Sequence, residues 1–203
     1  DGMQPQVEPQ RGGSIDLLKK YLSFTDENDY KLMVSWLLGS YYATDGYPIL
    51  VLNGGAGTAK SSTTTILRRL VDPHVAERRE PPKEARDVAA IVKNSYVVAF
   101  DNLTAIPKWL SESLCRISTG GSLGARAFYH LFKDAGFTAL RPSIVNGIPQ
   151  FVTESDLMDR SILLNLPQIQ EEERKAWGEM EIEFEKDRPL ILGALFDVLS
   201  NII

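Results

Sequence analysis

The stretch "PILVLNGGAGTAKSSTTTILRRL" (residues 48–70) joins a short apolar run to a glycine-rich turn, which a lysine and two serines follow. It matches the phosphate-binding loop pattern G-x-x-x-x-G-K-[ST], except that Ala59 replaces the second glycine. The apolar run over residues 48–53 is typical of a strand inside a parallel sheet, and residues 61–71 are expected to form a helix. A strand, a glycine-rich loop and a helix in this order predict an α/β fold.

A loop of this kind binds phosphate through backbone N–H groups, a lysine and a hydroxyl that also binds Mg²⁺. Lys60 and Ser61 stand at the required offsets, at a helix start where the dipole favours negative charge. The methyl group of Ala59 fits if the φ angle of this residue is negative. We therefore expect ATP and Mg²⁺ to bind here, and the candidate loop residues are Asn53, Gly54, Gly55, Ala56, Gly57, Thr58, Ala59, Lys60, Ser61 and Ser62.

A second apolar strand, expected over residues 95–104, carries Asp101 near its end. A carboxylate in this position can hold Mg²⁺ beside the loop serine, so Ser61 and Asp101 form the predicted metal site. If the glycine-rich loop were absent, the better explanation of Asp101 would be that it caps a helix or turn after the strand. Asn102 follows where many ATPases carry a glutamate that orients water. An amide cannot accept a proton, so hydrolysis is expected to be slow or to use a base from elsewhere.

Two further polar residues stand beside predicted strands. The third strand, "RPSIVNG", ends in Asn146, which either positions the attacking water or belongs to an Asn-Gly turn. Arg160 follows a short helix and precedes the fourth strand, "SILLNLP". An arginine there can reach a triphosphate held by a neighbouring subunit, or it forms a surface ion pair with Asp156 or Asp159.

The remaining elements follow from periodicity and turn residues. The second helix of the chain carries an apolar stripe of Met33, Trp36, Leu37 and Tyr41, which is expected to be buried. Helices are expected over residues 14–43 (as two helices), 82–94, 107–117, 171–187 and 189–203. We divide the chain into a disordered lead-in, a helical segment, a core and closing helices, over residues 1–13, 14–44, 45–168 and 169–203, with a β-hairpin inserted at about 124–141.

The composition is that of one globular domain, or of a core with a small satellite: 43% of the 203 residues are hydrophobic and 24% are charged. The net charge of −5 argues against a protein wrapped in nucleic acid, but not against a ring whose few pore residues contact a strand. Cys115 is the single cysteine, which fits a reducing cytoplasm, and two histidines, His74 and His130, make a histidine metal site improbable. No apolar run reaches the roughly 20 residues of a membrane span and no signal-like segment opens the chain, so no membrane partner is expected.

The segments "GGAGTAKS", "VVAFDN", "STGGSLGARAFYHLFKDAGFTALRPSIVNG" and "DLMDRSILLNLP", in this order, resemble AAA+-type ATPase domains of the superfamily 3 helicase kind. The likeness is to phage and mobile-element primase–helicase proteins and covers roughly residues 45–200. Its most specific part is the third segment, with Thr-Gly-Gly, an arginine, an aromatic residue, a hairpin and a strand ending in Asn. The resemblance implies a P-loop NTPase (AAA+-like) fold, a parallel sheet with flanking helices.

The resemblance also implies a homo-oligomer, a hexamer-like ring that binds nucleotide between subunits and single-stranded DNA in its pore. Asn146 would then be the sensor residue, Arg160 the arginine acting on the neighbouring subunit, and Arg126 a second residue at the subunit boundary. Lys133 and His130, at or near the hairpin tip, would contact DNA.

Three positions depart from the resemblance, and one further residue is a candidate that it implies. Ala59 and Asn102 depart from the family's pattern and bear on the hydrolysis rate, and Asp134 beside Lys133 dilutes the basic hairpin tip. Arg188, at the start of the last predicted helix, would be a lid-side sensor.

The leading interpretation is an ATP-hydrolysing motor domain, a DNA helicase or translocase of a phage or mobile-element replication protein. One alternative is an ATP-dependent switch that assembles on a protein partner and hydrolyses slowly, which Asn102 and the acidic charge favour. Another is a small-molecule P-loop kinase. The chain after Asp101 opposes a kinase, because it lacks an arginine-rich lid.

Overall fold

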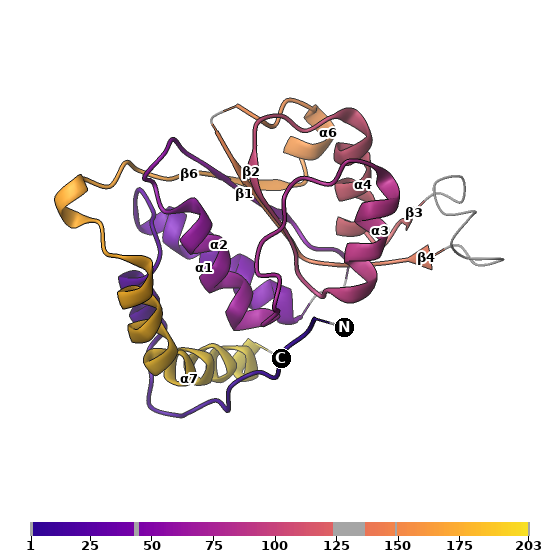
Figure 1. The fold of residues 1–203 in the computed structure, drawn as a ribbon. Coiled ribbons are helices and arrows are strands. Elements are labelled where there is room, and N and C mark those ends of the chain that lie inside the picture. The colour runs from indigo at the N-terminus through magenta and orange to yellow at the C-terminus, as the bar shows by residue number, and fades with distance from the viewer. Residues whose placement is uncertain (1, 43–44, 124–136, 149, 203) are drawn as a thin grey trace.

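The computed structural model describes the chain except for residues 1, 43–44, 124–136, 149 and 203. Its centre is a parallel sheet of four strands with helices on both faces (Figure 1), so the predicted α/β class is confirmed. The strands, in their order across the sheet, are β2 (Val98–Leu103), β5 (Ser143–Gly147), β1 (Ile49–Asn53) and β6 (Ser161–Asn165).

The central strand β1 is buried along its whole length, which explains its uninterrupted apolar sequence. Its neighbours pair with it in parallel register, so that Leu52 lies beside Asn146 of β5 and Asn53 beside Asn165 of β6. Because parallel strands end at the same edge of a sheet, the polar residues at the ends of β1, β2 and β5 come together there.

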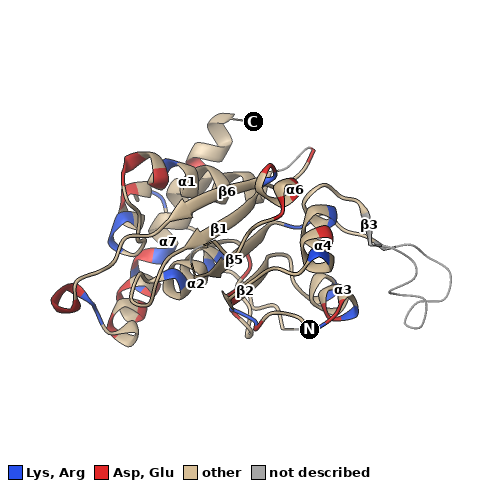
Figure 2. Cartoon of the chain, turned by 90° about the horizontal axis from the view of Figure 1, so that it is seen from above, with Lys and Arg blue, Asp and Glu red and all other residues tan. Residues whose placement is uncertain are grey.

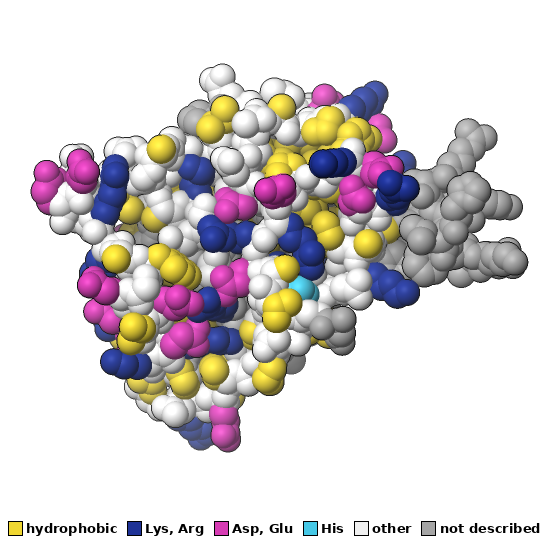
Figure 3. Space-filling view, viewed as in Figure 1, with side chains coloured by type: hydrophobic (Ala, Val, Ile, Leu, Met, Phe, Trp, Pro, Cys, Tyr) yellow, Lys and Arg dark blue, Asp and Glu magenta, His cyan; other side chains and the backbone are white. Residues whose placement is uncertain are grey.

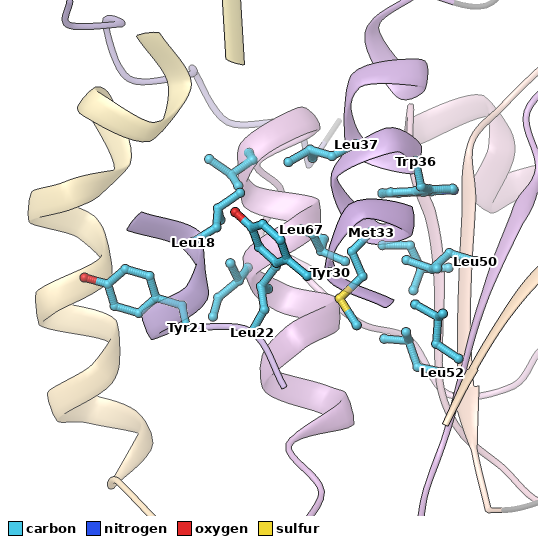
Figure 4. Close-up of a cluster of buried hydrophobic side chains, with 14 of the residues drawn as sticks. Leu18, Tyr21, Leu22, Tyr30, Met33, Trp36, Leu37, Leu50, Leu52 and Leu67 are labelled. Atoms are coloured by element: carbon cyan, nitrogen blue, oxygen red, sulfur yellow. The ribbon is translucent and has the colours of Figure 1, made fainter. Parts of the chain in front are cut away.

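Successive residues of β1 point to opposite faces, and each face packs against its own helices. One group of helices comprises α3 (Ala85–Asn94), α4 (Lys108–Ser118) and α6 (Ser155–Met158). The other comprises η1 (Ile15–Lys20), α1 (Glu27–Tyr41), α2 (Lys60–Val71) and α7 (Trp177–Ile202). Figure 2 shows α3 and α4 on one side of the strands and α2 and α7 on the other. In Figure 4, Met33 and Trp36 lie beside Leu50 and Leu52.

The starts of the helices are set by capping side chains, and one start differs from the predicted boundary. The side chain of Asp26 accepts hydrogen bonds from two N–H groups at the start of α1, and Ser14 caps η1, which is a 3₁₀ helix. α3 begins at Ala85 rather than at residue 82, because Glu84 and Asp87 form a capping box after the prolines. Helix boundaries are therefore set by the side chain that can satisfy the first N–H groups.

α7 is one helix where the sequence predicts two, and a short 3₁₀ turn, η2 (Glu171–Glu173), precedes it. Pro189 lies inside α7, and since proline has no N–H, one helical hydrogen bond is lost there. Figure 1 shows the helix changing direction along its length, as a proline kink would make it. Phe184, Ile191 and Leu195 are buried in one cluster on both sides of the kink, so packing keeps both halves helical. No helix in the described ranges, this long one included, has the apolar stretch that a bilayer crossing requires.

Residues 2–13, here called the N-terminal strap, lie against α2 and α7, although their composition predicts no order. Gln4 N–H donates to the carbonyl of Pro73, and Gln10 N–H donates to that of Pro189, both at 2.8 Å. The side chain of Gln6 donates to the carbonyl of Leu70 at 2.7 Å. Such contacts between distant segments cannot be predicted from a short sequence rich in Gln, Pro and Gly.

The hairpin expected at about 124–141 stays a prediction, because residues 124–136 lie outside the described residues, and two short strands flank them. β3 (Ser122–Leu123) pairs antiparallel with β4 (Phe137–Thr138). Arg126, His130 and Lys133, the predicted subunit-boundary and DNA-contacting residues, lie outside the described residues.

Candidate functional site

Nine of the predicted site residues line one cavity at the edge where the parallel strands end. The cavity measures about 480 Å³, within the range of small-molecule sites. The glycine-rich loop forms one wall, and β2 contributes Asp101 and Asn102. The lining residues are Ala56, Gly57, Thr58, Ala59, Lys60, Ser61, Asp101, Asn102 and Asn146.

The loop needs glycine at two of its positions for different reasons. Gly57 has φ +77°, a left-handed conformation that residues with a Cβ rarely adopt. A Cβ on Gly54 would lie 2.5 Å from Oγ1 of Thr58, a contact too short to exist. Thr58 in turn donates its hydroxyl hydrogen to the carbonyl of Gly55 at 3.1 Å, which closes the loop on itself.

Ala59 is strained, because its φ angle does not meet the condition that would accommodate the methyl group without cost. The residue has φ 58° and ψ 25°, in the left-handed region. The carbonyl of Ala59 accepts from the N–H of Thr63 at 2.9 Å, so α2 begins here. Left-handed backbone costs a residue with a Cβ about 1–2 kcal/mol. The phosphate-loop pattern has glycine at this position, and the geometry explains why.

Ala59→Gly is therefore expected to raise the free energy of unfolding. Relief of the left-handed strain exceeds the added chain entropy of glycine, which leaves a net gain of about 0.5–1 kcal/mol. Ala56→Gly in the same loop is the matched control, because Ala56 is exposed and its φ is not positive. It should lower the stability instead. Urea unfolding measures both variants, and equal shifts in the two would contradict the strain.

Lys60 is the first residue of α2, and its side chain reaches back across the loop. Its Nζ donates to the carbonyl of Gly54 at 2.7 Å and to that of Gly55 at 2.6 Å. Burial lowers the pKa of the Lys60 ammonium from its ordinary value, and the negative charge of Asp101 opposes this shift. Lys60 thus lines the loop cavity, and its ammonium is held by the loop carbonyls.

Ser61 and Asp101, the predicted metal ligands, are in direct contact. The hydroxyl of Ser61 donates to Oδ1 of Asp101 at 2.9 Å, although the residues are 40 positions apart. The described part of the chain has no cluster of three histidine, cysteine or carboxylate residues that could hold a metal. One hydroxyl and one carboxylate suit Mg²⁺, which completes its octahedron with water and substrate phosphate.

Asn146 ties the end of β2 to α2. Its Oδ1 accepts from the N–H of Asn102 at 3.1 Å, and its Nδ2 donates to Oγ1 of Thr64 at 2.9 Å. The residue pairs with Leu52 within the sheet, so the alternative of a strand-to-loop turn is wrong. Its side chain is fully buried and therefore underlies the cavity rather than projecting into it.

Asn102 has φ 62°, a left-handed conformation that asparagine tolerates better than most residues with a Cβ. It lies at the irregularity of β2 between Phe100 and Leu103. An asparagine here agrees with the backbone, whereas glutamate would be strained. The left-handed backbone therefore explains why asparagine, and not glutamate, stands at position 102.

Two predicted arginines do not reach the loop cavity of this chain. Arg160 pairs with the carboxylate of Asp156 and borders a separate cavity of about 220 Å³, so the surface ion pair is present. Its action on a neighbouring subunit stays a prediction. Arg188 is buried in α7 and bonds Glu185 at 2.9 Å and Gln6 at 2.6 Å, and its lid-side role stays a prediction.

Two other arginines do reach the site, and the sequence analysis missed both. Arg78 donates to Oδ2 of Asp101 at 3.1 Å. The guanidinium of Arg174 lies over Gly57. A Cβ added to Gly57 would be 2.5 Å from Nη2 of Arg174. Arg78 sits in a polar segment without periodicity, which gave no signal. Arg174 sits in the charged run "EEERK" soon after β6, and its nearness to the predicted sheet edge was the one clue.

A second cavity of about 470 Å³ adjoins the loop on its other side. Gly57, Ala59 and Ser62 border it, so the loop separates the two cavities. The remaining lining residues come from the start and the end of the chain: Lys19, Lys20, Tyr21, Leu22, Ser23, Phe24, Ile169, Glu173, Arg174, Lys175 and Met180.

Comparison with known proteins gives a family. Residues 15–202 match the family model described as actinomycete integrative conjugative element replication protein. No curated protein matches the chain. The match spans the loop, Ser61, Asp101 and the closing helix, and it confirms the predicted association with mobile-element replication. The chain belongs to the family of actinomycete integrative conjugative element replication proteins.

Proposed function

We propose that this replication protein binds ATP with Mg²⁺ in the cavity between the glycine-rich loop and β2, and hydrolyses it. The hydrogen bond of 2.9 Å between Ser61 and Asp101, beside the ammonium of Lys60, carries the proposal. It brings a hydroxyl, a carboxylate and a cation to one helix start, and these are the groups that a magnesium–triphosphate complex requires.

The residues present fit that complex. N–H groups at the start of α2 would hold the phosphates together with Lys60, which would exchange the loop carbonyls for phosphate oxygens. Ser61 and Asp101 would hold Mg²⁺, which neutralises phosphate charge when bound. The finer fold assignment, a P-loop NTPase of AAA+ type, is part of this proposal. It is supported by β5, which carries Asn146 next to its last residue and lies between β1 and β2.

The second cavity suits the base and ribose of the nucleotide. Leu22, Phe24, Ile169 and Met180 supply apolar surface there, and Arg174 supplies positive charge beside Gly57. An aromatic ring and aliphatic side chains can stack on a flat base. A nucleotide lying across the loop would therefore place its base on one side and its phosphates on the other.

An ATP-dependent switch with slow hydrolysis is the second candidate. Asp101 is the one carboxylate among the described residues that line the loop cavity, and it already accepts bonds from Ser61 and Arg78. Asn102 and Asn146 cannot accept a proton. Since Asp101 is engaged and no other carboxylate lines the cavity among the described residues, hydrolysis would depend on a group from a neighbouring subunit.

A ring-forming helicase or translocase is the proposed setting of this ATPase. β6 is an edge strand with Leu163 exposed, and Arg160 directly precedes it, so this edge can meet a second subunit. Acidic and basic side chains are interspersed on the face shown in Figure 3. Single-stranded DNA would accordingly contact a few residues, as in a pore, rather than a broad basic surface.

ATP hydrolysis measured with and without single-stranded DNA tests the proposal. Wild-type protein should hydrolyse ATP faster when DNA is present, and Asp101→Asn should reduce both rates to background. Asparagine keeps the shape of the side chain and removes the charge that holds Mg²⁺. Tight ATP binding with slow hydrolysis that DNA does not stimulate would favour the switch.

A further inference from the structure

Arg78 holds the carboxylate that the proposed metal site requires. Its Nη1 donates to Oδ2 of Asp101 at 3.1 Å, while the hydroxyl of Ser61 donates to Oδ1 at 2.9 Å. Both oxygens of the carboxylate are thus engaged by side chains of the protein. A metal ion bound at Asp101 would have to share the carboxylate with these donors or displace one of them.

The backbone around Arg78 is anchored on both sides. Arg79 N–H donates to the carbonyl of Ala99 at 3.1 Å, and Asp101 N–H donates to the carbonyl of Arg79 at 2.9 Å. On the other side, the carbonyl of Glu77 accepts from Nη1 of Arg68 at 3.0 Å. The side chain of Arg78 is nevertheless 37% exposed. The guanidinium can therefore leave the carboxylate while the main chain stays in place.

The two donors differ in their compatibility with a cation. The oxygen of Ser61 keeps lone pairs for a metal ion while its hydrogen bonds Asp101. The guanidinium of Arg78 has no lone pair to offer, and its positive charge repels a dication at close range. A dication held by Ser61 and Asp101 would consequently displace Arg78 and leave Ser61 in place.

We propose that Arg78 is a latch on the metal site: it neutralises Asp101 in the nucleotide-free protein and competes with Mg²⁺ for that carboxylate. Arg78 thereby sets the Mg²⁺ concentration at which nucleotide is held. It is a positioning residue, since it acts through Asp101. The inference rests on the proposed function of the loop cavity, and its experiment separates the two.

The test is a Mg²⁺ titration of the binding of a fluorescent ATP analogue to metal-stripped protein. Arg78→Gln should lower the Mg²⁺ concentration at half-maximal binding about three- to fivefold, which corresponds to the loss of a partly exposed ion pair. Arg86→Gln removes the same charge from an exposed residue of α3 that pairs with Glu84, and it should leave the titration unchanged.

A third variant separates competition from a structural role. Arg78→Lys keeps a competing positive charge and should titrate close to wild type, whereas a structural role of the guanidinium would move the lysine and glutamine variants together. An unchanged or higher Mg²⁺ requirement in Arg78→Gln overturns the latch. Failure of wild-type protein to bind the analogue at any Mg²⁺ concentration overturns the proposed nucleotide site itself. Thermal unfolding checks that each variant is folded.

Discussion

Lys60→Ala is expected to weaken ATP binding by about ten- to a hundredfold, the effect of losing a charged hydrogen-bond donor. The ammonium bonds two carbonyls of the loop and lies beside Asp101, so it is already placed where phosphate would bind. No other lysine lines the loop cavity within the described residues, so no nearby ammonium can replace it. Titration of a fluorescent ATP analogue with Mg²⁺ present measures the change.

Lys108→Ala provides the matched control for this measurement. Lys108 is also the first residue of a helix, α4, but it is exposed and does not line the loop cavity. Its loss changes the net charge equally and should leave ATP binding unchanged. A Lys60→Ala protein that remains folded and binds ATP as tightly as the Lys108→Ala protein would rule out the loop as the phosphate site.

The parts of the site that could be predicted from the sequence are those that depend on the order of residue types within a short segment. Residues 48–70 contain a buried strand, a glycine-rich turn and a helix, and the structure forms all three elements there. The contact of Ser61 with Asp101 followed from a general rule, since parallel strands end at one edge of a sheet. Neither inference needed knowledge of the tertiary contacts.

What could not be predicted depends on contacts between distant segments. Arg78 reaches Asp101 because the next residue, Arg79, pairs with β2. The sequence around Arg78 has no periodicity that would predict this pairing. The φ angle of Ala59 is imposed by the turn into α2, where the local residue type favours the opposite sign. Pro189 predicts a helix end, but the buried cluster on both sides of it outweighs one missing hydrogen bond.

The N-terminal strap is another long-range effect, and it packs closely against Gly193 of α7. A Cβ on Gly193 would lie 1.9 Å from the carbonyl oxygen of Gln10, and a backbone atom of the strap cannot rotate away as a side chain can. The close approach lets Gln10 N–H reach the carbonyl of Pro189 at the kink. The strap also engages Arg188 through Gln6, at 2.6 Å.

Gly193→Ala is therefore expected to displace the strap and lower the free energy of unfolding by about 1–3 kcal/mol, as overpacking does. Gly178→Ala in the same helix is the control, because nothing lies within 4 Å of its added Cβ. The control should gain up to about 1 kcal/mol from helix propensity. Trypsin cleavage after Arg11, an exposed residue of the strap, should accelerate in Gly193→Ala alone, since proteolysis follows local opening. Equal cleavage rates in the two variants would show that the strap does not depend on contact with α7.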